Sequence, residues 1–466
     1  MSGTTVEAPA RSETARRIAA LRTPKWYQNA RWTRLGGLLF AGIVLTLMFG
    51  EQGSVDDVFF ALKQLYEDPL PTLTWLVLMT AVWAFMEFGA PLRERARPAL
   101  EAVGARQKQA GSAVRSGVAR PAVKWPLLAA GALVLVLLPE FLATYWQQIL
   151  VGEIAIYVLL AVGLNVVVGW AGLLDLGFIA FFAVGAYSSA YWTGSLPVDP
   201  PVKLTPFLVI PVAMLTCLLA GLLLGAPTLR LRGDYLAIVT LGFHEIIYLV
   251  AKNREDFTNG PRGVIGVPPF KLDLGFWSYT WGDSGLSPKQ YWWLILVLGG
   301  LLIFLFRRLE HSRVGRAWTA IREDEVAAAA NGVNTVKYKL MAFAIGASTS
   351  GIAGVVYASK IGSFSPESFI LMYSVLVLAY VIFGGMGSLW GVILGTAFLA
   401  WLPQFLKDYV DPKDRFMYLG ALLVIMMIYR PQGLIPSRRR KRELIMAKEG
   451  IGDADAMSEP VGGRIA

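Results

Sequence analysis

The chain has 466 residues, of which 55% are hydrophobic and only 16% are charged, and its formal net charge is +10. A typical soluble domain is about a quarter charged, and a disordered chain combines low hydrophobicity with high charge density, so both classes are excluded. The single cysteine, Cys217, excludes an internal disulfide framework, and two histidines leave little for a His-rich metal site. An integral membrane protein is the class that remains.

Apolar segments recur along the chain at close to the length that crosses a bilayer. A helix needs about 20 mostly apolar residues to cross about 30 Å of hydrocarbon. Continuous apolar runs such as 127–138 and 294–306 argue against a β-barrel, whose strands alternate. The sequence therefore predicts an all-α integral membrane protein, a polytopic helical bundle of about 12 transmembrane helices: 35–50, 70–90, 126–143, 149–170, 172–192, 207–229, 235–251, 291–306, 339–358, 369–386, 389–406 and 416–429.

Lysine and arginine gather in stretches that lie on one side of these predicted spans. Seven fall in residues 1–34, eight in 91–124 and six in 307–338, and the unbroken basic run 438–442 follows the last span. Cytoplasmic loops carry the excess of Lys and Arg, so with twelve spans both termini are expected in the cytoplasm. Every cluster adjoins a span, which favours contact with anionic lipid headgroups and argues against nucleic-acid binding.

These features divide the chain into five parts. The first apolar run begins only near residue 35, after a long basic lead and with no small-residue cleavage site behind it, so we expect no cleavable signal peptide. The predicted parts are a cytoplasmic N-terminal tail (1–34), an accessory two-helix hairpin (35–90), a basic cytoplasmic linker (91–124), a ten-helix core (125–436) and a basic cytoplasmic C-terminal tail (437–466).

Several motifs that carry chemistry are absent from the sequence. There is no Gly-Lys dipeptide, so the phosphate-binding loop of P-loop ATPases is missing. HExxH, a Cys/His pair at zinc spacing and the GxSxG elbow are missing too. We therefore expect no catalytic residue, no metal and no cofactor in this chain.

The segment 307–338 is too polar to span a membrane. Its alanine-rich part, 316–330, predicts one helix, which Asn331 and Gly332 would end. Two interpretations remain open: a solvated surface helix between spans, or a docking element that transmits motion from a soluble partner. A membrane protein without an energy-converting domain of its own needs the second.

Ionisable residues inside predicted spans are functional hypotheses by default, because burying a charge in hydrocarbon is costly. Asp175 either caps the helix that follows it or lies at a helix interruption that lines a path. His244 and Glu245 fall near the middle of 235–251. Either a neutral His244 is hydrogen-bonded to Glu245 or to a neighbouring helix, or the two residues line a path.

Two glycine-rich stretches occupy equivalent places between apolar segments: 169–172 and 384–387. Transporters are often built from repeated halves, so the pair hints at a duplication. Close helix packing through glycine would produce the same pattern.

Seven short sequence words stand out along the chain: LRLRGDYLAIVTLGF (229–243), GPRG (260–263), VGRAW (314–318), IREDE (321–325), SPESF (365–369), GGMGS (384–388) and RPQGLIP (430–436). Taken together, these words resemble segments of the LivM-type membrane subunits of branched-chain amino acid ABC importers. They run in order from Leu229 to Pro436, and the two-span extension resembles the longer members of that family. One departure is the stretch Phe243-His244-Glu245, where relatives more often have a small residue before the glutamate.

This resemblance implies a division of labour between several chains in a bacterial inner membrane. The partners it implies are a second homologous permease subunit, two cytoplasmic P-loop ATPase subunits and a periplasmic substrate-binding protein. The segment around 316–332 would be the coupling element that seats on the ATPase, through paired charges on a docking surface. The residues expected to take part are Arg316, Arg322, Glu323, Asp324, Glu325 and Gly332.

The same resemblance implies that a branched-chain amino acid crosses the membrane along this chain. Such a zwitterion needs a weak, mixed path, for which the small and hydroxyl residues of 339–358 are suited, although helix packing explains most of them. The possible path residues are Asp175, Thr240, His244, Glu245, Ser348 and Thr349.

Other functions are kept as alternatives. A urea or short-amide permease would share similar motifs, although the two-span extension favours the amino acid. An ion-coupled secondary transporter would use carboxylates such as Glu153 and Asp175 as ligands and would need no long cytoplasmic docking helix. A membrane scaffold or enzyme subunit is the third alternative.

Overall fold

The computed structural model describes residues 130–228, 235–273, 278–281, 289–408, 415–430 and 432–436, together with scattered positions between 35 and 83. The chain divides into two compact units, Met1–Ala129 and Ala130–Ala466. The tails 1–34 and 437–466, the linker 91–124, most of the hairpin 35–90 and the word 229–234 lie outside the described residues. The helices, strands and contacts described below belong to the second unit.

Helices occupy each of the ten core segments that hydropathy predicted. The first is Ala130–Phe141, which ends in the 3-10 turn η2 (Leu138–Phe141). A continuous helix, Thr144–Trp170, comes next. The others are α9 (Phe178–Thr193), α10 (Pro206–Thr228), α11 (Tyr235–Asn253), α13 (Lys289–Glu310), α16 (Thr335–Ile361), α17 (Leu371–Gly384), α18 (Leu389–Phe405) and α19 (Arg415–Tyr429).

The helix Thr144–Trp170 changes between α- and π-helical winding three times. It consists of α7 (Thr144–Ile149), the π-helical turn η3 (Leu150–Ile154), α8 (Ala155–Leu164) and a second π-helical turn, η4 (Asn165–Trp170). Such turns are rare and occur often at functional sites. Both carry a polar side chain that bonds to another part of the core: Glu153 in η3 and Asn165 in η4.

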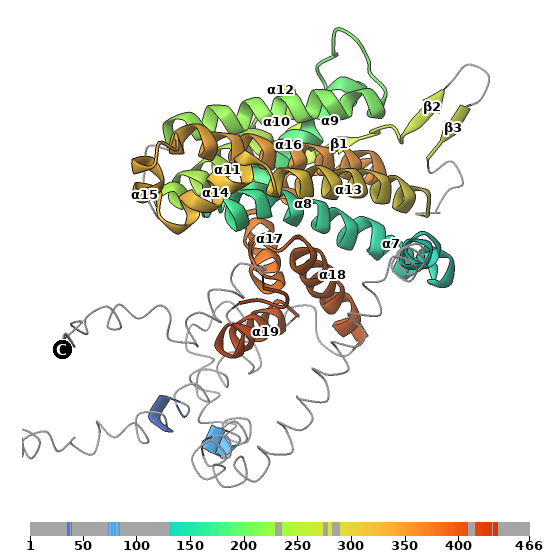
Figure 1. The fold of residues 1–466 in the computed structure, drawn as a ribbon. Coiled ribbons are helices and arrows are strands. Elements are labelled where there is room, and N and C mark those ends of the chain that lie inside the picture. Colours follow the sequence, from blue (N-terminus) through green and yellow to red (C-terminus); the bar gives the residue numbers. More distant parts are fainter. Residues whose placement is uncertain are drawn as a thin grey trace, which may run out of the picture. The chain divides into compact units, whose positions relative to one another are not determined.

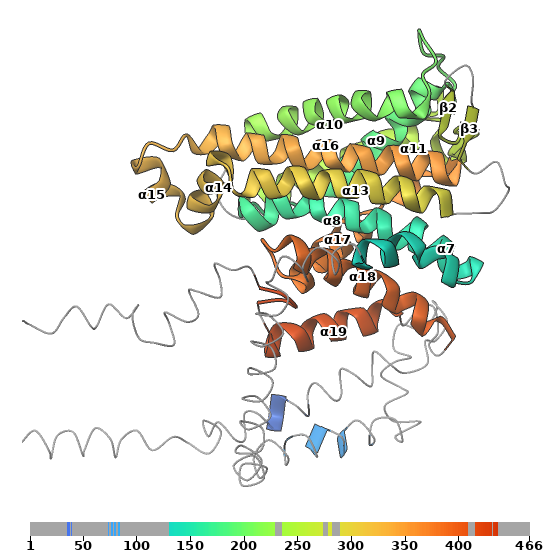
Figure 2. The same cartoon turned by 45° about the vertical axis from the view of Figure 1, so that its right-hand side comes forward.

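The segments that connect the helices lie at two opposite ends of the bundle (Figures 1 and 2). At one end are α14 (Arg313–Glu323), α15 (Glu325–Ala330), the α17–α18 turn and residues 432–436, whose Leu434 and Ile435 amides donate to Phe383 and Gly384. We call it the inner end. The other, outer end holds α12 (Glu255–Thr258), η5 (Gly260–Arg262), η6 (Pro366–Phe369), η7 (Leu406–Asp408) and four short strands.

The strands form two antiparallel ribbons that the sequence did not predict. β1 (Val264–Ile265) pairs with β4 (Ser363–Phe364), with Val264 opposite Phe364. β2 (Lys271–Asp273) pairs with β3 (Ser278–Thr280). With two or three residues each, they are too short to leave an alternating hydrophobic pattern, so hydropathy could not find them.

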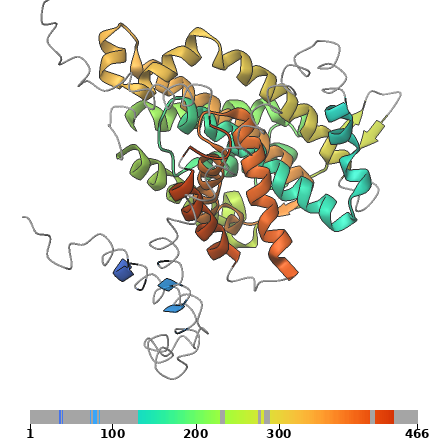
Figure 3. The same ribbon diagram turned by 60° about the horizontal axis from the view of Figure 1, so that its bottom comes forward.

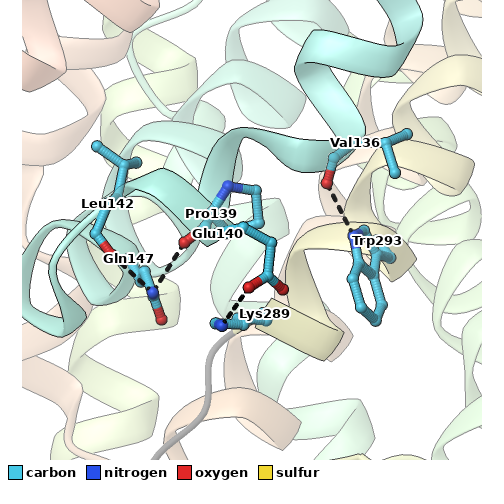
Figure 4. A network of polar contacts seen from close by, with 7 residues as sticks. All are labelled: Val136, Pro139, Glu140, Leu142, Gln147, Lys289 and Trp293. Carbon is cyan, nitrogen blue, oxygen red and sulfur yellow. Dashed lines mark hydrogen bonds and ion pairs between the residues drawn. The ribbon is translucent and has the colours of Figure 1, made fainter.

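The first core helix is fastened to α13 at the outer end (Figure 4). Lys289 pairs with Glu140 at 2.7 Å, and the Trp293 indole donates to the carbonyl of Val136 at 3.0 Å. Gln147 donates to the carbonyls of Pro139 and Leu142, both at 2.8 Å. These bonds satisfy carbonyls where the helix Ala130–Phe141 ends.

The centre of the bundle is α16, which packs against α8, α9 and α10. Small residues make this packing possible: a Cβ on Gly351 would lie 2.9 Å from the carbonyl oxygen of Ala213 and from the Cys217 sulfur. A Cβ on Gly354 would lie 2.6 Å from the backbone of Phe182. Glycine therefore sets how closely these helices approach. Helices α17 to α19, orange to red, lie on the side that Figure 3 brings forward.

Six of the described helices are long and apolar enough to cross a membrane, and two shorter apolar ones, Ala130–Phe141 and Leu389–Phe405, accompany them. Together with the composition, this makes the chain a polytopic helical membrane protein. The total of twelve spans stays a prediction.

Candidate functional site

The polar inner-end segment forms two helices, so the prediction of one helix over 316–330 was wrong. The break is at Asp324, whose backbone is extended (φ −155°, ψ 111°) and whose carboxylate accepts the amides of Val326 and Ala327. It thereby caps α15, as Ser312 caps α14. Helix α15 ends at Asn331 and Gly332, where Gly332 has φ +82°.

Helix α14 is seated on the bundle through Trp318. This side chain is fully buried and stacks on Trp170 of η4, with ring centroids 6.1 Å apart and planes 20° apart. Its indole donates to the carbonyl of Tyr338 at 2.6 Å. Trp170 in turn meets the edge of Phe306 in α13. Trp318 thus joins α14 to η4 by ring stacking, to α13 through Trp170, and to α16 by a hydrogen bond.

Arg322 connects the end of α14 to the glycine-rich stretch 169–172. Its guanidinium donates to the carbonyl of Gly169, and its side chain covers Gly172, where a Cβ would lie 2.7 Å from the Arg322 Cγ. Gly172 has φ +72°, a conformation that glycine adopts without strain. The arginine predicted to face a partner therefore reaches into the bundle.

The second glycine-rich stretch meets the first at the same place. The side chain of Asn165, in η4, accepts the amide of Gly387 at 2.8 Å. A Cβ on Gly169 would lie 2.6 Å from the same amide nitrogen. We call Asn165, Gly169, Gly172, Arg322 and Gly387 the glycine junction. It joins α14, η4 and the α17–α18 turn.

The carboxylates of Asp324 and Glu325 are both engaged within the chain. Glu325 pairs with Lys339 at 2.5 Å, and the Lys339 side chain is 5% exposed. Asp324 is bonded to the first turn of α15. Arg316 is exposed and donates to the carbonyl of His311 at 3.3 Å. Asp324 and Glu325 of the acidic triplet therefore stabilise the structure around α15, whether or not the triplet also contacts a partner.

The surface that α15 offers outward is mostly small and apolar. Val326 is 63% exposed, and Ala327, Ala329 and Ala330 are exposed beside it. Glu323 lies at the α14 side of this surface and is exposed as well. An exposed apolar stripe at a helix end is typical of an interaction surface, and the prediction from charge alone missed it.

Asp175 is fully buried in the loop between η4 and α9. One carboxylate oxygen accepts the amide of Gly177 at 2.8 Å, and the other has no hydrogen-bond partner. Helix α9 begins at Phe178 after Gly177, without a side-chain cap. Asp175 is therefore not the helix cap, and the expected start of this span at 172 was six residues early.

Thr240 and His244 share the face of α11 that turns into the bundle. Thr240 accepts the amide of Leu176 at 3.1 Å, which brings this face against the loop that carries Asp175. His244 is 2% exposed, and neither ring nitrogen has a hydrogen-bond partner. Glu245 is exposed on another face. The hydrogen bond expected for His244 is therefore missing, and the pair 244–245 is split.

The hydroxyls of Ser348 and Thr349 bond to their own helix. Ser348 donates to the carbonyls of Ala344 and Ile345, both at 2.9 Å, and Thr349 donates to Gly346 at 2.7 Å. A Cβ on Gly163 would collide with the Thr349 hydroxyl. Both residues lie where α16 packs tightly.

The family-like words gather at the two ends of the bundle. IREDE, GGMGS and RPQGLIP meet at the inner end, through Arg322, Gly387 and Ile435. GPRG and SPESF meet at the outer end, where a Cβ on Gly263 would lie 3.1 Å from the Ser365 Cα. Residues far apart in the sequence thus form two compact regions.

Comparison with known proteins gives one consistent answer. Residues 148–429 match the family described as branched-chain amino acid transport system / permease component. The high-affinity branched-chain amino acid transport system permease protein LivM of Escherichia coli is 37% identical over 394 residues, which cover 79% of this chain and 87% of the relative. The probable LivM of Methanocaldococcus jannaschii is 26% identical over 57% and 81% of the two chains. The permease LivH of Escherichia coli is 27% identical over 40% and 59%. No solved structure matches the chain.

Proposed function

Because this chain belongs to the family of branched-chain amino acid transport system permease components, we propose that it is the membrane-spanning subunit of an ATP-driven importer. In this role it forms the path for leucine, isoleucine and valine that a periplasmic binding protein delivers. The chain itself is a transport subunit, and the ATP is hydrolysed by partner ATPases.

The proposed assembly contains a second homologous permease and two cytoplasmic P-loop ATPases. Similarity to both LivM and LivH relatives supports a permease pair. The proposed location is the bacterial inner membrane, with both termini in the cytoplasm. The excess of Lys and Arg in 1–34, 91–124, 307–338 and 438–442 supports this orientation and provides contacts to anionic lipid.

The observation that carries the proposal is the way α14 and α15 are built. Helix α15 offers an exposed apolar surface around Val326, while α14 is bonded to the bundle by Trp318 and Arg322. A partner that moves α15 therefore pulls on η4 through α14. The bond between Asn165 and Gly387 carries the same displacement to α17 and α18. ATP-driven closure of the ATPases would in this way shift the bundle between two states.

The proposed path passes the polar face made by Asp175, Thr240 and His244. The free carboxylate oxygen of Asp175 and the two free nitrogens of His244 are buried polar atoms without partners. Burying such atoms without a hydrogen-bond partner costs free energy. The ammonium and the carboxylate of a passing amino acid can supply the missing partners. Ser348 and Thr349 are weaker candidates for the path, because their hydroxyls already donate to carbonyls of their own helix. Glu245 is a weaker candidate as well, because it is exposed on another face of α11.

Reconstitution tests the proposal directly. The chain is placed in proteoliposomes with its second permease and the two ATPases, and binding protein loaded with radioactive leucine is added outside. We expect uptake that requires ATP and binding protein and that unlabelled valine competes with, while urea and acetamide do not. Uptake driven by an ion gradient alone, without ATP, would refute the proposal.

A further inference from the structure

Two opposite charges lie near each other at the outer end of the bundle without forming an ion pair. Glu153 is in the π-helical turn η3, and Lys360 is next to the last residue of α16. Gly152, which precedes Glu153 in the chain, lies directly beside the Lys360 ammonium. Each charge is held by a different neutral group: Gln404 donates to Glu153 at 2.8 Å, and Lys360 donates to the carbonyl of Gln148 at 3.4 Å. Both charged side chains are partly exposed in this chain.

Local structure brings the two charges together. Gly152 lies beside the Lys360 side chain, where a Cβ would be 3.6 Å from Cε and would collide with the ammonium. Glycine at 152 thus leaves room for the ammonium next to η3. Gln404 comes from α18, so three membrane helices contribute to the arrangement.

Aromatic rings border the charges on the inward side. Tyr157 follows Glu153 by one helical turn and meets Tyr380 of α17 edge to face, with ring centroids 5.8 Å apart. Tyr380 is 4% exposed, so its ring belongs to the packed wall of the bundle. A charge pair beside an aromatic wall is the composition of a site for a small amphiphilic ligand.

A second pair at the same end shows that opposite charges can close there. Glu140 and Lys289 join two neighbouring helices in a direct ion pair at 2.7 Å (Figure 4). In hydrocarbon, opposite charges pair with each other or face a water-filled cavity. The pair Glu153 and Lys360 stays open and partly exposed, so its charges are available to a ligand.

We infer that Glu153 and Lys360 bind the ammonium and the carboxylate of a zwitterionic amino acid, whose apolar side chain lies against Tyr157 and Tyr380. This inference rests on the proposed transport function and adds a receiving site at the outer end of the path. A ligand that carries both charges can engage both side chains, whereas a neutral amide satisfies neither. Weak binding suits such a site, because the ligand must leave it again.

The test measures ligand preference on the assembled complex in lipid nanodiscs without binding protein. Saturation-transfer NMR compares three probes: leucine, leucinamide, which lacks the carboxylate, and 4-methylpentanoate, which lacks the ammonium. On the unmodified complex, leucine binds best. Lys360→Gln is expected to lower the affinity for leucine roughly tenfold, because one charge-assisted hydrogen bond is lost. The affinities for leucine and leucinamide should then be equal. Glu153→Gln is expected to bring leucine level with 4-methylpentanoate.

Lys289→Gln is the matched control, since it removes a lysine charge at the same end from a closed ion pair. It should leave all three preferences unchanged. The inference would be overturned if both site variants showed the same ligand preferences as the unmodified complex. It would also be overturned if the unmodified complex did not bind leucine. Release of the second permease from either site variant in size-exclusion chromatography would overturn it too, because the charges would then serve subunit contact. ATP-dependent leucine uptake by the unmodified complex tests the proposed function separately.

Discussion

Replacing Arg322 by alanine should separate ATP hydrolysis from transport. The Arg322 guanidinium donates to the carbonyl of Gly169 and is the side-chain link between the end of α14 and η4. A hydrogen bond to a charged group contributes about 1.5–3 kcal/mol, and leaving a buried carbonyl without its donor adds to the loss. At about 1.4 kcal/mol per factor of ten, the bonded arrangement becomes roughly ten- to a hundredfold less favoured.

The assay is the number of leucine molecules imported per ATP hydrolysed in proteoliposomes. Helix α15 is capped by Asp324 and its exposed surface is unchanged by the substitution, so ATPase binding and basal hydrolysis should persist while the transport ratio falls. Arg313→Ala is the control: this arginine is exposed at the start of the same helix, α14, and is not among the residues expected to contact the ATPase. A normal ratio in Arg322→Ala, or an equal fall in Arg313→Ala, would refute transmission through the glycine junction.

Three further substitutions test other parts of the structure. Val326→Asp places a charge on the exposed surface of α15 and should weaken ATPase binding in a pull-down, whereas the exposed Lys337→Asp should not. Gly172→Ala forces a side chain into φ +72° against Arg322, and a cost of about 1–2 kcal/mol should lower the thermal midpoint of the detergent-solubilised chain; an unchanged midpoint would contradict the close contact between these two residues. His244→Leu fills a similar volume without polar atoms, so leucine uptake should fall while the thermal midpoint holds or rises; normal uptake would remove His244 from the path.

Hydropathy located the ten core segments because each needs only a local excess of apolar residues. It could not find the break at Asp324. Alanine around 316–330 favours one helix, but an Asp that accepts the second and third amides of the next turn starts a new helix instead. The docking surface of Arg316, Arg322, the acidic triplet and Gly332 that the resemblance implied stays a prediction, but the charge pattern could not show what these side chains contact within the chain. Glu325 pairs with Lys339, fourteen positions further along the chain, and Arg322 reaches a carbonyl 153 residues away.

The two glycine-rich stretches are the clearest case of a correct observation without a mechanism. Their similarity was visible in the sequence, but only the fold brings Gly169 and Gly387 to one place, 218 residues apart along the chain. A side chain at either position would block the hydrogen bond that is made there. The carbonyl of Gly169 accepts from Arg322, and the amide of Gly387 donates to the side chain of Asn165. A duplication is not needed to explain them, since close contact requires glycine on both sides.

The positions of the π-helical turns suggest how one long helix could serve both ends of the bundle. Turns with i to i+5 hydrogen bonds are rare interruptions of otherwise regular α-helices and are frequent at functional sites. In Thr144–Trp170, η4 carries Asn165 and the carbonyl of Gly169 at the inner end, while η3 carries Glu153 at the outer end. The regular and almost fully buried α8 connects them. A pull on η4 by α14 is therefore expected to move α8 as a rigid rod and to change the spacing between Glu153 and Lys360. If that expectation holds, spin labels at the two ends of Thr144–Trp170 will shift together when ATP binds, and Arg322→Ala will abolish the shift at the outer end; an outer shift that persists in this variant would show that the rod is driven from elsewhere.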